Sequence, residues 1–140
     1  MAGSDEYGHV SPELDELSVE VLSSAFDLLA EGEEVGVILG IGHRNGDVEA
    51  LRLTDDGPDA LIEGARHQVR HARGAERYAI AYEGAIELED GSYADAVLLE
   101  FGERGHRSFS AYSLFEGRGE GEDFRFSDPA PAGEEEPLLG

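Results

Sequence analysis

The stretch Val35–Leu53, VGVILGIGHRNGDVEALRL, decides the fold of this chain. It begins with a continuous apolar run over residues 35–41, which is typical of a short strand buried on both faces. Asn45-Gly46 follows, and this dipeptide is the strongest sequence signal for a two-residue hairpin turn. Apolar and polar residues then alternate over residues 47–53, as expected for a returning strand. The stretch therefore predicts two neighbouring antiparallel strands.

A helix is predicted on each side of this hairpin. The segment 11–14, Ser-Pro-Glu-Leu, has the features of a helix start: a Ser N-cap, Pro at the first helical position and an acid in the first turn. Apolar residues then recur at spacings of three and four to about Ala30, which indicates an amphipathic helix. Residues 55–58, Asp-Asp-Gly-Pro, open a second helix that is predicted to run to about Arg73 and to stop at Gly74.

Three further strands are predicted after the second helix, over residues 77–88, 93–101 and 107–115. A short apolar piece at residues 124–126 follows a glycine-rich segment. Short turns make consecutive strands antiparallel neighbours. The order α-β-β-α-β-β-β predicts an α+β fold, with a single antiparallel sheet of about five strands and both helices packed on one face. The other face of such a sheet would contact water or a partner.

The length of 140 residues suits one domain with a core of its own. We assign residues 1–127 to this α+β domain and expect residues 1–10 to be frayed. Residues 128–140 contain three of the five prolines and the acidic run Glu134–Glu136. They are predicted to form an acidic, extended tail, with Leu138 and Leu139 as its candidate anchor.

The composition excludes several classes of protein. The chain has no cysteine, so disulfide frameworks, thiolate zinc sites and cysteine nucleophiles are all ruled out. The N-terminal residues lack the basic and apolar regions of a signal peptide. The longest apolar run, residues 35–41, is far shorter than the roughly 20 residues that span a bilayer. We therefore expect a cytoplasmic protein that does not enter a membrane.

The charge is strongly negative, with 32 acids against 10 bases and a net charge of -22. Every base is arginine. This charge repels nucleic acid and anionic lipid, so neither is expected as a partner. It reflects either a surface that captures a cationic partner or adaptation to solvent, since molar salt shortens the Debye length to about 3 Å. The even spread of acids and the absence of lysine favour adaptation to a high-salt cytoplasm or to an acidic proteome.

The segment 67–71, His-Gln-Val-Arg-His, places two histidines four residues apart on the second predicted helix. Such a pair can bind one zinc ion, and zinc proteases add a Glu directly after the first histidine. Gln68 stands in that place and cannot accept a proton from water. A helical projection puts His67 and His71 opposite the apolar face. We expect a solvated surface that binds metal only adventitiously, and we predict no metal site and no cofactor.

Four of the ten arginines lie close to this histidine pair, at Arg66, Arg70, Arg73 and Arg77. Three interpretations are open. The arginines could complement the helix C-terminus and pair with neighbouring acids. They could instead dock an anion or an acidic segment, such as Glu134–Glu136 of the same or a second chain. The third interpretation is a nucleotide or nucleic-acid site.

Two other features of the sequence are candidate sites. The glycine-rich segment 40–46 superficially resembles a phosphate loop, but it leads into a strand rather than a helix, so we interpret it as a turn. Asp95 lies between two alanines in a predicted strand, as the one acid that we place in an apolar neighbourhood. It either faces solvent or helps Tyr82 and Tyr112 to line a ligand pocket between sheet and helices.

Residues 82–84, Tyr-Glu-Gly, and 93–100, YADAVLLE, together resemble a group of small uncharacterised microbial proteins with a "VYDG…TDAI…E" strand–turn–strand core. The resemblance covers residues 76–115 and, loosely, 136–139. It departs from the pattern at Glu83, where the pattern has Asp, and at Ala94. That family has no assigned activity, so the resemblance implies only a common fold and an interior Asp.

No catalytic set is recognisable in this sequence. The leading interpretation is a non-catalytic module that self-associates, as a dimer, or binds a protein partner. The alternative is a small-ligand-binding protein or enzyme with its pocket between the sheet and the helices.

Overall fold

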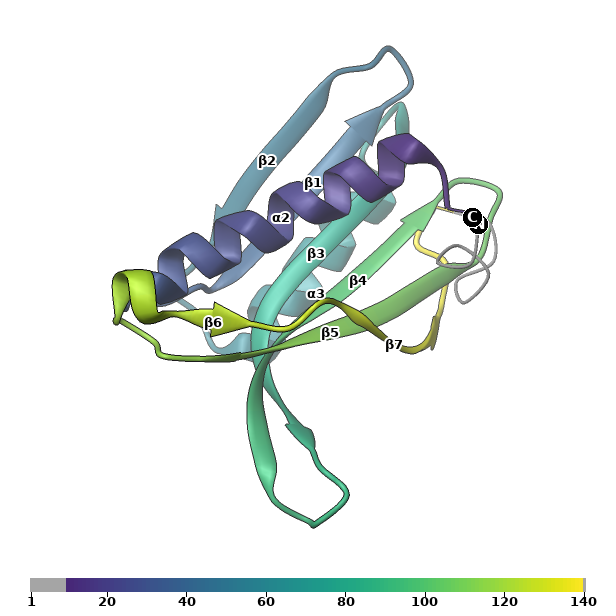
Figure 1. Cartoon of the computed structure of the whole chain (residues 1–140). Helices are drawn as coiled ribbons and strands as arrows, with labels where there is room; N and C mark the ends of the chain where they lie inside the picture. The colour runs from purple at the N-terminus through teal and green to yellow at the C-terminus, as the bar shows by residue number, and fades with distance from the viewer. Residues whose placement is uncertain (1–9, 140) are drawn as a thin grey trace.

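An antiparallel sheet of seven strands runs through the part of the chain that the computed structural model describes, residues 10–139 (Figure 1). The segment expected to be frayed, residues 1–10, lies outside this range apart from Val10. The helical elements are α2 (Pro12–Ala30), α3 (Pro58–His71) and the short 3-10 helix η1 (Gly121–Asp123). The strands are β1 (Val37–His43), β2 (Val48–Leu53), β3 (Ala75–Glu87), β4 (Tyr93–Glu103), β5 (Ser108–Glu116), β6 (Arg125–Phe126) and β7 (Ala130–Glu135).

The strands lie in the order β2-β1-β3-β4-β5, and both β6 and β7 pair with β5 at the far edge. The predicted α+β class, the antiparallel sheet and the element order up to β5 are confirmed. The prediction of about five strands is wrong, because residues 125–135 add β6 and β7. Proline cannot donate a backbone hydrogen bond, which is tolerated only at an edge, and this is why a proline-containing segment can still be a strand here.

The hairpin predicted within residues 35–53 forms between β1 and β2. Its turn is one residue longer than predicted. The His43 amide donates to the Asp47 carbonyl (2.8 Å), so that three residues, 44–46, make the loop. Gly46 has a φ of 97°, a conformation that glycine adopts without a steric penalty. This is the loop type in which glycine follows a tight turn.

Helix α2 begins and ends close to the predicted residues. The Ser11 hydroxyl accepts a hydrogen bond from the Leu14 amide (3.1 Å), and Pro12 occupies the first turn. The predicted apolar positions of this helix are buried, among them Leu14, Leu17, Val21 and Leu29. Helix α3 ends at His71, two residues before the predicted end at Arg73.

The two helices pack on opposite faces of the sheet, so the prediction that they share one face is wrong. Strand β1 shows why: Ile38 packs into the cluster under α2, whereas Val37, Leu39 and Ile41 pack under α3. A strand that is apolar on both sides has to be covered on both sides. Figure 1 shows α2 in front of the sheet and α3 behind it.

The C-terminal segment, expected to be an extended tail, is the last part of the sheet. β7 pairs with β5 from Ala130 opposite Tyr112 to Glu135 opposite Ser108. Leu138 and Leu139 are buried in the cluster under α3. The Arg104 guanidinium also donates a hydrogen bond to the Leu139 carbonyl (2.7 Å). The chain end is therefore held by sheet pairing, apolar burial and a charged hydrogen bond.

The β3–β4 hairpin extends beyond the body of the molecule (Figure 1). Its tip carries two exposed apolar residues, Leu88 and Tyr93. Within residues 10–139, no helix is long and apolar enough to cross a membrane.

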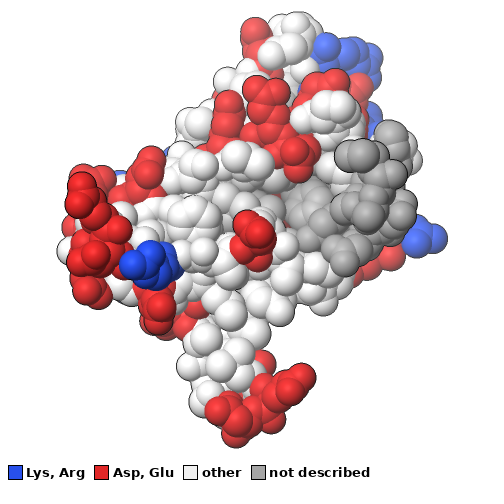
Figure 2. Space-filling view, viewed as in Figure 1, with Lys and Arg blue, Asp and Glu red and all other residues white. Residues whose placement is uncertain are grey.

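The acidic side chains are divided into separate groups on the face that carries α2. Figure 2 shows them at the tip of the β3–β4 hairpin, around η1 and beside α2, with largely uncharged surface between the groups. The negative charge is therefore spread over this face and does not form one continuous acidic patch.

Candidate functional site

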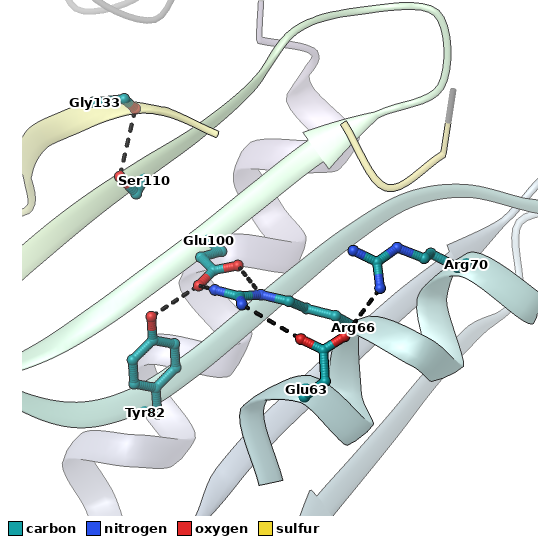
Figure 3. A network of polar contacts seen from close by, with 7 residues as sticks. All are labelled: Glu63, Arg66, Arg70, Tyr82, Glu100, Ser110 and Gly133. Atoms are coloured by element: carbon teal, nitrogen blue, oxygen red, sulfur yellow. Dashed lines mark hydrogen bonds and ion pairs between the residues drawn. The ribbon is translucent and has the colours of Figure 1, made fainter. Parts of the chain in front are cut away.

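A buried carboxylate joins α3 to the middle of the sheet. Glu100 lies in β4 with its side chain 6% exposed, on the face that α3 covers. Arg66 of α3 donates from Nε to Oε1 (3.0 Å) and from Nη2 to Oε2 (2.5 Å) of this carboxylate. The Tyr82 hydroxyl of β3 donates to Oε2 (2.8 Å). Figure 3 shows the three side chains converging from one helix and two strands.

This network continues to the surface along α3. The Glu63 carboxylate lies 3.8 Å from Arg66 Nη1 and 3.1 Å from Arg70 Nη1 (Figure 3). Glu63 is 63% exposed and Arg70 is 41% exposed, so water screens this outer pair. The inner pair, between Arg66 and Glu100, is the one that the protein shields.

The surroundings of Arg66 and of two tyrosines raise the pKa of each of these groups. The hydrogen bond to Glu100 raises the pKa of Arg66. Burial raises the pKa of Tyr82, and its hydrogen bond to Glu100 raises it further. Burial also raises the pKa of nearby Tyr78 to about 12, although the Ser108 hydroxyl acts in the opposite direction. At neutral pH both tyrosines are therefore protonated and Arg66 is charged.

The charged groups of the inner cluster are paired with each other. Both oxygens of Glu100 accept hydrogen bonds, and the two tyrosine hydroxyls are held in their neutral form. The arrangement connects α3 to the sheet through the shielded ion pair between Arg66 and Glu100.

The three residues predicted to line a ligand pocket are not brought together. Tyr82 and Tyr112 do share the face under α3, because both pair with Leu98 from opposite sides. Asp95 lies three residues from Leu98, on the other face, and is exposed in the projecting hairpin opposite Ala85.

The acid in an apolar neighbourhood is Glu100, and reasoning from the sequence missed it. It lies between Leu99 and Phe101, both buried, in the same strand as Asp95. The signal was present, since a charged residue within an apolar strand needs a partner. The sequence could not identify that partner, because Arg66 is 34 positions away.

The four arginines near the histidine pair do not form one patch. Arg66 points inward to Glu100, and Arg70 pairs with Glu63. Arg77 lies on the opposite face of the sheet, 3.7 Å from Glu103, a carboxylate that also accepts a hydrogen bond from Ser11 at the start of α2.

Arg73 stands apart from the other three, in the loop after α3, and makes no hydrogen bond or ion pair with any residue from 10 to 139. The acidic run does not reach these arginines within the chain. Glu134 instead lies 3.7 Å from Arg107.

His67 and His71 are exposed on α3, as the helical projection predicts. Their rings stack with centroids 4.1 Å apart, and His71 Nδ1 lies 3.1 Å from the His67 carbonyl oxygen. No group of three or more metal-ligating side chains occurs among residues 10–139. Adventitious metal binding by this pair stays a prediction.

The outer strand β2 is the least protected element of the sheet. All of its residues except Leu53 are exposed, and within residues 10–139 it pairs with β1 alone. It contains no proline and no bulge, and its two charges, on Glu49 and Arg52, cancel. Leu51 and Val48 are exposed by 38% and 56%. An exposed apolar edge strand of this kind is a template for pairing with another strand.

The opposite edge of the sheet is blocked. It is divided into β6 and β7, and Pro129 and Pro131 remove two backbone donors. The pairing with β5 shifts register between Ser110 and Ala111. Glu134 and Glu135 add negative charge. Irregular pairing, proline and charge are the devices that keep sheet edges from joining, whereas β2 has regular pairing, no proline and no net charge.

An apolar groove of about 350 Å³ lies between α2 and β2. Val19 of α2 and Val48 of β2 form its rim and are exposed by 54% and 56%. Leu17, Ile38 and Gly40 line it more deeply. The groove extends the apolar surface of the β2 edge onto the face that carries α2.

Comparison of the chain with protein-family models, with curated proteins and with solved structures gives no match. The resemblance of residues 76–115 to a microbial family therefore stays an expectation, and the function has to be argued from the geometry.

Proposed function

We propose that this protein is a non-catalytic module that forms a homodimer through antiparallel pairing of two β2 strands. The contrast between the two sheet edges carries this proposal: one edge is blocked by proline, irregular register and charge, and the other is regular, exposed and apolar. A two-fold pair uses the same edge of each chain, so the assembly closes at two copies.

The charges at the ends of β2 favour the antiparallel arrangement. Arg44, in the turn before β2, is 75% exposed, whereas Asp55 and Asp56 are exposed in the turn after it. An antiparallel pair brings the start of one strand to the end of the other. Arg44 of each copy then approaches the two aspartates of the other copy. A parallel pair would place like charges together at both ends.

Self-association is expected to disappear when Leu51 is replaced by glutamate. Leu51 lies at the middle of β2, so a two-fold axis through the strand pair brings the two copies of this residue close together. A carboxylate there adds like-charge repulsion and removes apolar contact. Light scattering after size exclusion, in molar potassium chloride to screen the net charge, should give a dimer for the native chain and a monomer for Leu51→Glu.

Leu88→Glu is the matched control for this variant. Leu88 is also 38% exposed, but it lies at the tip of the β3–β4 hairpin. The control should remain dimeric, since it adds the same charge far from β2. A native chain that stays monomeric in molar salt at high concentration would contradict the proposal, as would equal dissociation of the two variants.

We also propose that the acidic surface is an adaptation to a high-salt or acidic-proteome cytoplasm. The support is the distribution of acids on the face that carries α2, where they lie in separate groups and not in one continuous patch (Figure 2). A dispersed net charge of -22 repels itself, and added salt screens this repulsion.

The melting temperature is therefore expected to rise with potassium chloride. Relief of roughly 1 kcal/mol of repulsion corresponds to a rise of about 4 °C in a domain of this size. Most of the rise should occur below about 0.5 M, because screening saturates as the Debye length shortens. Differential scanning calorimetry of the monomeric Leu51→Glu variant separates this effect from dimer formation. A melting temperature that is independent of salt would remove the solvent interpretation.

A further inference from the structure

A pocket formed by the described residues lies at the end of the sheet, where the β1–β2 turn meets the loop after α3. Its volume is about 600 Å³, within the range of small-molecule sites. His43, Asp47 and Glu49 line it from the hairpin, and Arg73 and Gly74 line it from the loop. Val48 is the one residue that lines both this pocket and the apolar groove beside α2.

The acids around this pocket are all occupied by neighbours. Glu49 is bound to His43 Nε2 (2.9 Å), and the Asp47 carboxylate accepts a hydrogen bond from the Asn45 amide (3.0 Å). Arg44, which also lines the pocket, pairs with Glu76 (3.1 Å). Among these charged groups only Arg73 has no partner within residues 10–139.

An unpaired arginine is unusual in a chain with 32 acids and 10 bases. Of the arginines in the described part, only Arg73 and Arg125 make neither a side-chain hydrogen bond nor an ion pair. The planar guanidinium matches carboxylate and phosphate groups with two parallel hydrogen bonds. Arg73 lines this pocket, and no carboxylate among residues 10–139 pairs with it.

His43 adds a second polar group beside Arg73. Its side chain is 16% exposed, and a carboxylate can only accept, so Nε2 carries the proton that binds Glu49. Nδ1 has no hydrogen-bond partner among residues 10–139 and lies next to Gly74, where an added Cβ would be 3.8 Å away. Glu49 thus fixes the ring, and Nδ1 keeps a lone pair that can accept a hydrogen bond from a ligand hydroxyl.

We propose that this pocket binds a small oxyanion, a carboxylate or phosphate group, with Arg73 as its charge partner. His43 Nδ1 adds a second contact by accepting a hydrogen bond from the hydroxyl of a hydrogen phosphate, which a carboxylate cannot supply. The net charge of the chain opposes anion binding from a distance. At physiological ionic strength, however, the Debye length is about 8 Å, so remote acids are screened while direct contact with Arg73 persists. The proposal does not rest on dimer formation.

The test is a titration of the ¹⁵N-labelled protein with sodium phosphate and, separately, with sodium acetate, at constant ionic strength. Saturable shifts are expected at the Gly74 amide and the Arg73 Nε–H, with a Kd on the order of 1 mM. If the shift changes saturate with phosphate alone, the ligand is a phosphate group. If they saturate with acetate alone, the ligand is a carboxylate. The titration is repeated on the Leu51→Glu variant, in which the β2 edges are expected not to pair. The pocket then stays accessible even if dimer formation covers it in the native chain.

Arg73→Gln should weaken the binding at least about tenfold, since it removes a charge-assisted hydrogen bond. Arg125→Gln is the matched control: it removes the other unpaired arginine, on β6, and should leave the Kd unchanged. Shifts that do not saturate, or equal Kd values for the two variants, would overturn the proposal.

Discussion

Replacing Leu138 and Leu139 together by alanine is expected to lower the free energy of unfolding by about 5 kcal/mol. Both side chains are buried, and they pack with Ile41, Tyr78 and the other residues of the cluster under α3. Each truncation of a buried leucine costs about 2–5 kcal/mol, through lost transfer energy and the cavity that remains. Since domains of this size are stable by only about 5–15 kcal/mol, the double variant should be close to unfolding at room temperature.

Equilibrium unfolding in urea measures this loss. Leu88→Ala makes the same chemical change at a residue that is 38% exposed, and it should cost well under 1 kcal/mol. If both substitutions had similarly small effects, the last residues would not be part of the core. The segment from residue 128 onward would then be a dispensable extension despite its pairing with β5.

Arg66→Met is expected to destabilise the fold by about 3 kcal/mol, the lower end of the range for a broken buried ion pair. The variant keeps the apolar stem of the side chain but leaves Glu100, 6% exposed, with Tyr82 as its remaining donor. An uncompensated buried charge causes the loss. The lower end of the range applies because Arg66 itself is 30% exposed, so that water can partly replace it.

Two further variants show whether the buried charge is the cause. Arg70→Met, four residues along the same helix, breaks an outer pair with Glu63 and should cost less than about 1 kcal/mol. Arg66→Met combined with Glu100→Leu removes both charges and should recover most of the lost stability, as replacement of buried pairs by apolar residues often does. The Tyr82 hydroxyl would lose its acceptor, so full recovery is not expected. A double variant no more stable than Arg66→Met would refute this explanation.

The features that the sequence predicted well depend on short-range relations. Ser11 caps α2 because its hydroxyl reaches an amide three residues away, and Gly46 allows the tight turn between two adjacent strands. The exposure of His67 and His71 follows from the period of one helix. In each case the residues that decide the outcome lie within a few positions of one another.

The faces on which the helices pack could not be derived in the same way. The apolar run of β1 indicated burial on both sides, but the hydrophobic pattern of a helix only says that it has a buried stripe. Which face of the sheet α3 covers depends on how the chain crosses between β2 and β3. The candidate site has the same limit, because Glu100 is paired with residues 18 and 34 positions away.

The sequence by itself determined the α+β class, the antiparallel pairing of neighbouring strands, the helix starts and the density of negative charge. Only the tertiary structure decided that β2 lies at an open edge while the proline-rich C-terminal segment closes the other, and that Arg73, beside His43, has no partner among residues 10–139. Strand order is the physical reason. A strand with the alternation of β2 can lie inside a sheet or at its edge, and its free hydrogen-bonding groups depend on which strands pair with its neighbour β1.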